Sequence, residues 1–382
     1  MNPTDFSLFQ ESFPVNRELI WLNNCGTTPA STHNLKAVST FLDGYSKHGI
    51  FTETEKFYAV KQEIKTKLSG LLGGNSHEFT LIRNTSEGMN IFSHGLNLPS
   101  GSTILILENE YPSNVYPWEH LQKKGCTLRF LPTGNSPHEF LKIFQDNLDS
   151  TTKVVSLSAV HWCTGMPLPL QEIGEICKQR NLYFVVDGAQ GVGHIEINVK
   201  KMHIDFMAFS AWKWLLGPLG LGVLYVSQNR LDDLSVAMKG TGSVVDSDNY
   251  LPYRTTYKPG ADRYEVSTPS FIDWVYFKSS INFLSEIGFS KTMERIYLLA
   301  EYLAKGLKQL NYSVNTQDFS EKTGIIVAKR ENLDSSKVVS HLFHHKVIAA
   351  SRLGGIRFAP HAYNSEAQID RVIDILSREF GE

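Results

Sequence analysis

Tyr183-Phe184-Val185-Val186-Asp187-Gly188-Ala189-Gln190 joins a short apolar, β-branched run to a carboxylate at its end. A second apolar run, residues 204–209, leads into Ser210-Ala211-Trp212-Lys213-Trp214. Runs of this length and composition predict β-strands, so Asp187 and Lys213 each follow the end of a strand. In open α/β sheets, ligands bind beyond the carboxyl ends of the strands. The two stretches therefore predict one site that contains both an acid and an amine.

This pair of residues has the chemistry that pyridoxal phosphate requires. A lysine amine forms a Schiff base with the cofactor aldehyde. A carboxylate that keeps the pyridine nitrogen protonated lets the ring accept electrons from a substrate carbanion. Each residue also has a simpler interpretation, because an Asp after a strand is often a turn or cap residue and a Lys between two Trp can pack its stem on their rings. The rest of the chain is needed to choose.

Strand-like and helix-like segments alternate through the middle of the chain. The predicted strands are residues 80–83, 103–107, 127–131, 154–158, 183–186, 206–210 and 222–226. Helical patterns between them include residues 87–96, 116–124 and 170–179. Such alternation predicts an α/β fold with a mainly parallel, seven-stranded sheet covered by helices on both faces. The turn Asn84-Thr85-Ser86 also falls at a strand end, beside Asp187 and Lys213.

The character of the chain changes near residue 239. Residues 239–263 are rich in Gly, Ser, Asp, Tyr and Pro and predict a long loop, which in a compact enzyme is usually functional or disordered. Predicted helices at 271–286, 291–309, 335–345 and 366–379 and strands at 324–328 and 355–359 follow as an α+β pattern. We expect an N-terminal arm (1–20) that packs with the small domain, a large domain (21–262) and a small C-terminal domain (263–382).

Composition excludes several classes of partner. The chain has 37 basic and 39 acidic residues, a formal net charge of -2, which gives no reason to expect nucleic acid or an anionic membrane as partner. No apolar run reaches the roughly 20 residues that span a bilayer, and the start lacks the pattern of a secretory signal, so we expect a cytoplasmic protein. The four cysteines, Cys25, Cys126, Cys163 and Cys177, show no zinc spacing, and we expect no metal site.

Several polar residues near the predicted strand ends suit a phosphorylated cofactor. The turn Asn84-Thr85-Ser86 opens a helix, where free backbone N–H groups and a capping hydroxyl bind anions; an ordinary capped helix is the alternative. Ser210 precedes Lys213 by three residues and can donate to the same phosphate. Gln190 can point at the ring hydroxyl of the cofactor. Tyr111, in Glu110-Tyr111-Pro112-Ser113-Asn114, offers an aromatic face for stacking.

The order of these motifs resembles the class V aminotransferase family. The sequence carries Asn-Thr-Ser-Glu-Gly at 84–88, Glu-Tyr-Pro-Ser-Asn at 110–114, Asp-Gly-Ala-Gln at 187–190 and Ser-Ala-Trp-Lys-Trp at 210–214. Members are fold-type I pyridoxal phosphate enzymes, among them cysteine desulfurases, cysteine/cystine C–S lyases, isopenicillin N epimerase-like proteins and kynureninases. The resemblance extends from Trp21 to the end. It is specific for cofactor chemistry and weakly specific for substrate.

The resemblance implies a role for each motif residue. Lys213 would carry the cofactor, Asp187 would pair with its pyridine nitrogen and Gln190 with its ring oxygen. The phosphate would be held by Thr85, Ser86 and Ser210, and Tyr111 would stack on the ring. Thr268, in Tyr264-Glu265-Val266-Ser267-Thr268-Pro269, would reach the phosphate of a second subunit, which implies a homodimer. Arg357 would grip the substrate carboxylate, with an ordinary ion pair as the alternative, and Asn24 is a further candidate for substrate binding.

Three departures from the family pattern bear on the reaction. Trp212 stands where relatives usually have His before the lysine; its indole N–H donates a hydrogen bond but carries no titratable proton. Trp162, in His161-Trp162-Cys163-Thr164-Gly165, stands where desulfurases often have Asn and resembles the C–S lyase and epimerase-like branch, so it is expected to wall the pocket. No cysteine follows Cys177, and Arg352-Leu353-Gly354-Gly355 occupies the stretch where a desulfurase would carry its nucleophile.

These departures favour α,β-elimination from cysteine, cystine or a cysteine conjugate, with Lys213 removing the α-proton and His161 protonating the leaving group. Amino transfer to a keto acid is the alternative. A cysteine desulfurase, an amino-acid epimerase and a protein that binds the cofactor without turnover are less favoured. The substrate is thus expected to be a small amino acid.

Overall fold

The computed structural model describes residues 4–50, 54–315 and 322–381. Its largest sheet has seven strands in the order β2-β8-β7-β6-β5-β3-β4. These strands are β2 Phe79–Ile82, β3 Thr103–Leu107, β4 Thr127–Leu131, β5 Thr152–Ser158, β6 Tyr183–Asp187, β7 Phe206–Ser210 and β8 Gly222–Val226. β8 pairs antiparallel with both neighbours, and the other neighbouring pairs are parallel. The predicted strands match these to within two residues at each end.

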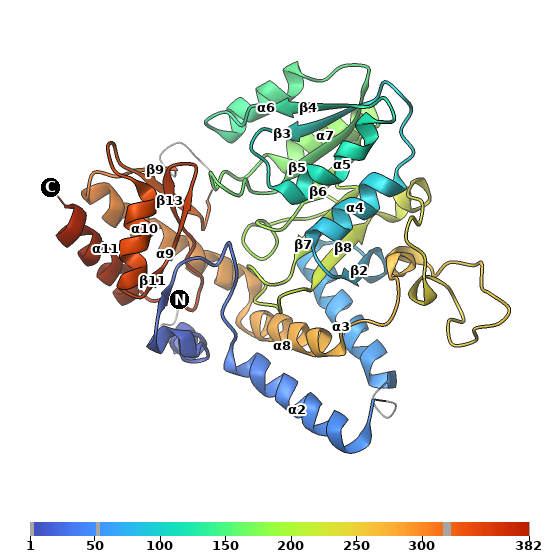
Figure 1. Cartoon of the computed structure of the whole chain (residues 1–382), viewed down its shortest axis with the longest axis horizontal. Helices are drawn as coiled ribbons and strands as arrows, with labels where there is room; N and C mark the ends of the chain where they lie inside the picture. The colour runs from blue at the N-terminus through green and yellow to red at the C-terminus, as the bar shows by residue number, and fades with distance from the viewer. Residues whose placement is uncertain (1–3, 51–53, 316–321, 382) are drawn as a thin grey trace.

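Helices cover both faces of this sheet because its central strands are apolar on both sides (Figure 1). Along β6, Val185 packs with α4 Thr85–Gly95 and α5 Tyr116–Gln122, whereas Phe184 and Val186 pack on the opposite side. That side is covered by α3 Thr54–Leu72, α6 Pro137–Asp146, α7 Leu170–Arg180 and α8 Phe271–Ile287. Strands buried on both faces read as continuous apolar runs, as in parallel sheets generally.

A second sheet lies in the C-terminal part of the chain, in the order β12-β13-β10-β9 with antiparallel pairing. Its strands are β9 Ser313–Val314, β10 Ile326–Lys329, β12 Ala350–Arg352 and β13 Gly355–Phe358. The adjoining helices are α9 Phe289–Gln309, α10 Ser335–His344 and α11 Glu366–Phe380, which contribute to its apolar core. The β12–β13 hairpin sets Ala350 opposite Arg357 and Arg352 opposite Gly355. Both arginines therefore belong to the same hairpin.

The N-terminal segment touches both parts of the molecule. β1 Ile20–Trp21 pairs in parallel with β11 Val347–Ile348. The aromatic side chains at positions 9 and 13, in α1 Thr4–Glu11 and just after it, join the core beneath the large sheet and stack near Phe283 and Tyr363. The division into an arm, a large domain and a small domain stays a prediction.

Two long helices, α2 Thr32–His48 and α3, were not predicted from the sequence. Only Asn34 of α2 is buried, and Leu35, Leu42 and Tyr45 remain exposed, so α2 lacks a clear apolar stripe that periodicity detects. The expected loop 239–263 is largely irregular, with short 3-10 turns at Thr241–Ser243 and Gly260–Tyr264. Among the described residues, no helix has both the length and the apolar character needed to cross a membrane.

Candidate active site

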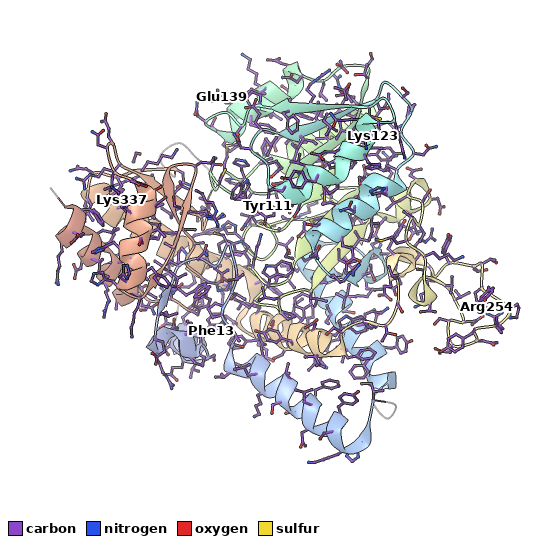
Figure 2. The ribbon with its side chains drawn as sticks, viewed as in Figure 1. Phe13, Tyr111, Lys123, Glu139, Arg254 and Lys337 are labelled. Atoms are coloured by element: carbon purple, nitrogen blue, oxygen red, sulfur yellow. The ribbon has the colours of Figure 1, made fainter. Side chains whose placement is uncertain are left out.

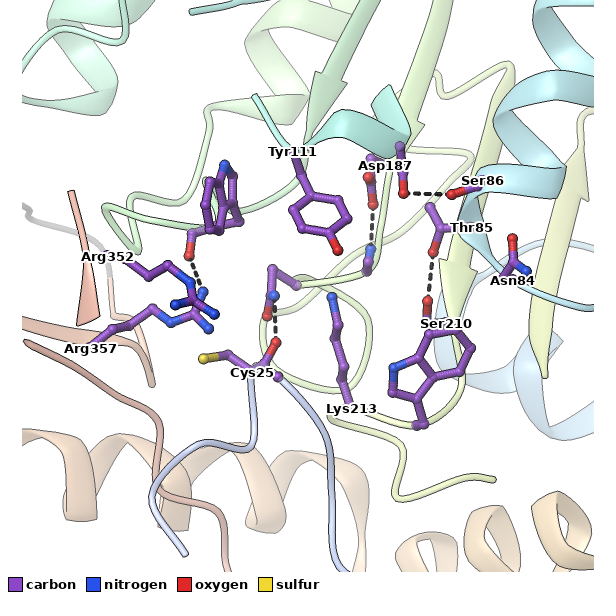
Figure 3. Close-up of a pocket in the computed structure, with 16 residues that line it drawn as sticks. Cys25, Asn84, Thr85, Ser86, Tyr111, Asp187, Ser210, Lys213, Arg352 and Arg357 are labelled. Carbon is purple, nitrogen blue, oxygen red and sulfur yellow. Dashed lines mark hydrogen bonds between the residues drawn. The ribbon is translucent and has the colours of Figure 1, made fainter. Parts of the chain in front are cut away.

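A pocket of about 380 Å³ opens at the carboxyl ends of the parallel strands, and most of the predicted site residues line it (Figure 3). The predicted residues that line it are Thr85, Ser86, Tyr111, Trp162, Asp187, Gln190, Ser210, Trp212, Lys213 and Arg357. Asp187 ends β6 and Ser210 ends β7, whereas Arg357 comes from β13 in the other sheet. The pocket is therefore closed by groups from both sheets.

Lys213 and Asp187 face the middle of the pocket without a protein counter-ion. Lys213 points toward Tyr111 in Figure 3, with its Nζ 5.6 Å from the ring centroid. Asp187 is 4% exposed and accepts a hydrogen bond from the backbone N–H of Ala189 at 2.9 Å. Within the described parts of the chain, neither side chain forms an ion pair. Burial lowers the pKa of Lys213, and burial together with the Glu110 carboxylate raises the pKa of Asp187 to about 7.

Hydroxyl groups gather at the first turn of α4. The Thr85 and Ser210 hydroxyls lie 2.7 Å apart, and so do those of Ser86 and Ser113. Asn84 caps the helix by accepting from the backbone N–H of Glu87. This part of the pocket thus combines hydroxyl donors with the free N–H groups of a helix N-terminus, which is a suitable environment for a phosphate.

The close packing of strand β8 against this turn requires a glycine. A Cβ at Gly222 would lie 2.9 Å from the Asn84 Cα and equally close to the Phe209 carbonyl oxygen. Gly222 faces Ser210 in the β7–β8 register. Without a side chain there, the Asn84 turn and the end of β7 approach each other, which places Thr85 beside Ser210.

Aromatic and amide groups form the walls beside Lys213. Tyr111 and Trp162 meet edge to face with centroids 5.5 Å apart. The Trp162 indole donates to the Asn109 carbonyl at 2.7 Å, so it is held as a wall of the pocket. Gln190 donates from Nε2 to the Cys25 carbonyl and accepts from the Trp214 indole. The second hydrogen of Nε2 remains for a ligand oxygen.

Two arginines close the end of the pocket opposite the hydroxyl cluster. Arg357 is 3% exposed; its Nη1 donates to the Trp162 carbonyl at 2.7 Å, and its buried Nε has no partner in the described structure. Arg352 lies beside it in Figure 3 and is exposed, with Nη1 bonded to the Ser351 carbonyl. The pocket is thus lined by three basic side chains and one carboxylate: Lys213, Arg352, Arg357 and Asp187. An anionic ligand is favoured there.

Three predicted site residues do not line this pocket. Asn24 is fully buried and accepts a hydrogen bond from the Tyr363 hydroxyl. His161 is 1% exposed and bonds to Thr164 and the Asn109 carbonyl, and burial lowers its pKa to about 4. A buried neutral imidazole behind the pocket wall is poorly placed to protonate a leaving group, so we do not retain that role. Thr268 lines a separate cavity with Lys61 and Trp274.

The sequence analysis assigned no site role to Ser113, Arg352 or Cys25, all of which line the pocket. Ser113 lies in the quoted Glu110–Asn114 stretch, where a hydroxyl after a strand end was a usable signal. To assign Arg352 to the site, one would have had to predict that residues 350–358 form a hairpin. Its turn is at Leu353-Gly354, where both residues have positive φ. Cys25 reaches the pocket through the segment after β1, a contact over long range that no local pattern encodes.

The family model described as Aminotransferase class-V matches residues 20–372. The chain belongs to the class V aminotransferase family. Its members use pyridoxal phosphate, so this protein is a pyridoxal phosphate-dependent enzyme of class V. The expected family and cofactor are confirmed at this level.

Relatives and solved structures cover nearly the whole chain. A probable cysteine desulfurase of Pyrococcus abyssi is 26% identical over 387 residues, 96% of each chain. An uncharacterized protein of Schizosaccharomyces pombe is 28% identical and covers 95% of this chain and 84% of its own. The cystine C–S lyase C-DES, in complex with its reaction product cysteine persulfide, is 22% identical with a TM-score of 0.89, over 97% of this chain and 100% of that one.

The apo cysteine desulfurase of Thermococcus onnurineus is 24% identical with a TM-score of 0.86, over 98% of this chain and 97% of that one. At such identities these structures establish the fold, and the predicted fold-type I architecture is confirmed. The residues of the pocket fit the cofactor, because a buried acid, a buried amine and a hydroxyl cluster at a helix N-terminus line the same cavity. The acid would suit the ring nitrogen of the cofactor, the amine its aldehyde, and the hydroxyl cluster its phosphate.

Proposed function

We propose that this protein cleaves the carbon–sulfur bond of a cysteine-type amino acid by α,β-elimination, with cystine as its preferred substrate. The observation that carries the proposal is the pair of arginines at one end of a pocket whose other end suits pyridoxal phosphate. When bound, that group would draw electrons from the substrate α-carbon. The products would be pyruvate, ammonia and a thiol or persulfide.

At the cofactor end, Thr85, Ser86 and Ser210 would hold the phosphate and Asp187 the ring nitrogen. Lys213 would hold the aldehyde carbon, and its amine would also take the α-proton of the substrate. Its pKa is lowered by burial, which favours a neutral amine able to accept that proton. Trp162 and Tyr111 would restrict water at the reacting carbon. Trp212 would offer at most a neutral indole N–H, since it cannot titrate.

At the substrate end, Arg357 would bind the α-carboxylate through its Nε, which has no partner among the described residues, and the guanidinium N–H groups that do not bond to Trp162. Arg352 supplies a second cation within the same pocket. Cysteine has one carboxylate, whereas cystine has two, so a second arginine adds attraction only for the longer substrate. Cleavage of cystine at Cβ–S would release cysteine persulfide, the product named for C-DES.

A homodimer would complete this site. Thr268 lines a cavity rimmed by exposed residues of the 241–269 segment and of α3, where Tyr250 and Tyr58 are 72% and 54% exposed. Apolar side chains of α2 are exposed as well, among them Leu35 and Leu42. Exposed large apolar side chains that form a patch often mark protein–protein contacts. We propose that a second subunit covers it and that Thr268 reaches the phosphate in that subunit.

The test is a product analysis of purified, cofactor-loaded protein supplied with cystine or cysteine. We expect pyruvate and ammonia, with a higher kcat/KM for cystine. Amino transfer that requires a keto acid would instead establish the transaminase alternative. Absence of product from every sulfur amino acid, together with cofactor colour, would contradict the proposal.

Desulfuration is the second candidate because Cys25 lines the pocket. In that reaction the Cys25 thiol would take the sulfur of cysteine, giving alanine and a persulfide on Cys25. Burial raises the pKa of Cys25, which opposes formation of the thiolate needed for attack. Elimination is therefore preferred. Alanine formation that disappears in Cys25→Ala would support the second candidate, whereas pyruvate formation that survives this change would support elimination.

A further inference from the structure

Glu110 is a second buried carboxylate close to the pocket, and the proposed reaction gives it no role. It is 6% exposed. Four groups donate hydrogen bonds to it: the Tyr111 N–H at 2.8 Å and the Ser158 hydroxyl to Oε1, and the Ser158 N–H at 3.1 Å and Asn114 Nδ2 at 3.3 Å to Oε2. Burial raises the pKa of Glu110, and the four donated hydrogen bonds oppose that shift. Because all four partners donate, the network is arranged for the ionised carboxylate.

The network places this charge next to Asp187. Ser158 ends β5 and faces Asp187 across the β5–β6 pair, and neighbouring strands lie about 4.8 Å apart. The Ser158 residue that donates twice to Glu110 is therefore the direct neighbour of the acid that would hold the pyridine nitrogen. No cation pairs with Glu110 among the residues that the structure describes. Other ionisable groups that interact with this pair are Lys213 and Cys163.

The same network holds the turn that carries Tyr111. Glu110 bonds to the backbone of Tyr111 and to the side chain of Asn114, which in turn accepts from the Ser156 hydroxyl. The 3-10 turn Pro112–Asn114 is thereby tied to β5. The position of Tyr111 over the pocket thus depends on a carboxylate beneath it.

We propose that Glu110 is a positioning residue for the cofactor. It fixes the Tyr111–Asn114 turn against β5, and it supplies a second negative charge beside Asp187 that favours a protonated pyridine nitrogen. This inference rests on the proposed cofactor site. A carboxylate about one strand away from Asp187 is expected to change the protonation equilibrium of the pyridine nitrogen by about tenfold.

The test compares two probes that differ only at the ring nitrogen. Cofactor-free protein is titrated with pyridoxal phosphate and with its 1-deaza analogue, in which a CH group replaces the nitrogen. We expect Glu110→Gln to weaken binding of pyridoxal phosphate about tenfold more than binding of the analogue, because altered turn contacts affect both probes alike and the lost charge affects only the probe with a ring nitrogen. The matched control is Glu108→Gln, which removes the same charge from an exposed position two residues earlier and is expected to change neither.

Equal weakening of both probes would overturn the electrostatic role, and unchanged binding of both would overturn the inference altogether. Should Glu110→Gln fail to fold, Glu110→Asp keeps the charge on a shorter side chain. Glu110→Asp is then expected to keep the wild-type ratio of the affinities for pyridoxal phosphate and its analogue, even where both affinities are reduced. A ratio that falls toward one would contradict the electrostatic role of Glu110. Failure of the wild-type protein to bind pyridoxal phosphate at all would instead refute the proposed function.

Discussion

The two ends of the pocket are built differently. At the cofactor end, Asp187 and Ser210 end neighbouring parallel strands, and Thr85 opens the helix after a third. At the substrate end, Arg352 and Arg357 come from a short hairpin of the other sheet, and Cys25 comes from the segment after β1. One end rests on strand ends of the large parallel sheet, and the other on a hairpin of the second sheet and on the segment after β1.

This difference separates the residues proposed to bind the cofactor from those proposed to select the substrate. Strands buried on both faces tolerate little change in position, so groups at their ends would hold a shared cofactor in a fixed way. Hairpins and connecting segments tolerate substitution, and under the proposed function they would set which substrate enters and which bond breaks. Variants at the cofactor end are therefore expected to abolish chemistry, whereas variants at the substrate end change preference.

The largest effect is expected for Lys213→Ala. Loss of the amine removes both the attachment point of the cofactor and the base for the α-proton, and a positioned base contributes about 10²–10⁴-fold in rate. We expect pyruvate release from cystine to fall by at least that factor while circular dichroism shows an unchanged fold. The control is Lys239→Ala, a change at an exposed lysine outside the pocket. If Lys213→Ala kept activity within threefold of the wild type, the cofactor end of the pocket would not be essential for the chemistry, and its contrast with the substrate end would fail.

The contrast between the two ends of the pocket also explains which site residues could be predicted from the sequence. Asp187, Lys213, Thr85 and Ser210 follow apolar runs whose periodicity predicts strands, and strand ends converge in a parallel sheet. Arg352 and Cys25 reach the pocket only through long-range packing. Strand β12, which carries Arg352, is too short for a clear alternation pattern, and α2 leaves apolar residues exposed, so neither gives the local signal on which such reasoning depends.

An intermediate effect is expected for Arg352→Ala. A charge-assisted hydrogen bond contributes about 1.5–3 kcal/mol, but Arg352 is exposed, so solvent reduces the gain. We expect KM for cystine to rise about fivefold and KM for cysteine to change less than twofold. Arg357→Ala serves as the comparison, because loss of the buried fork should raise KM for both substrates. Equal effects of Arg352→Ala on the two substrates would contradict the assignment of a second carboxylate to this residue.

A third effect concerns the stability of the cofactor-free protein and not its catalysis. The pKa of Asp187 is raised to about 7 from 3.8, so the folded state binds its proton more tightly than the unfolded state. That stabilisation is present at acidic pH and is lost as pH rises toward 7. Between pH 5 and 7 we expect the free energy of unfolding to lose about 2 kcal/mol through this group.

Asp187→Asn should remove this pH dependence, because the amide does not titrate. Urea unfolding of the wild type and the variant at pH 5 and pH 7 measures the difference directly. The variant is expected to be more stable than the wild type at pH 7 by a larger margin than at pH 5. A margin that does not change with pH would show that the acid is not held in an unfavourable, ligand-free environment.

The central claim is that the amine of Lys213 attaches the cofactor. The direct measurement is borohydride reduction of the protein loaded with pyridoxal phosphate, followed by digestion and mass spectrometry of the peptides. We predict that the reduced cofactor is found on the peptide containing Lys213. Its presence on another lysine, or its absence from all peptides of a protein that retains the bound cofactor, would contradict the account.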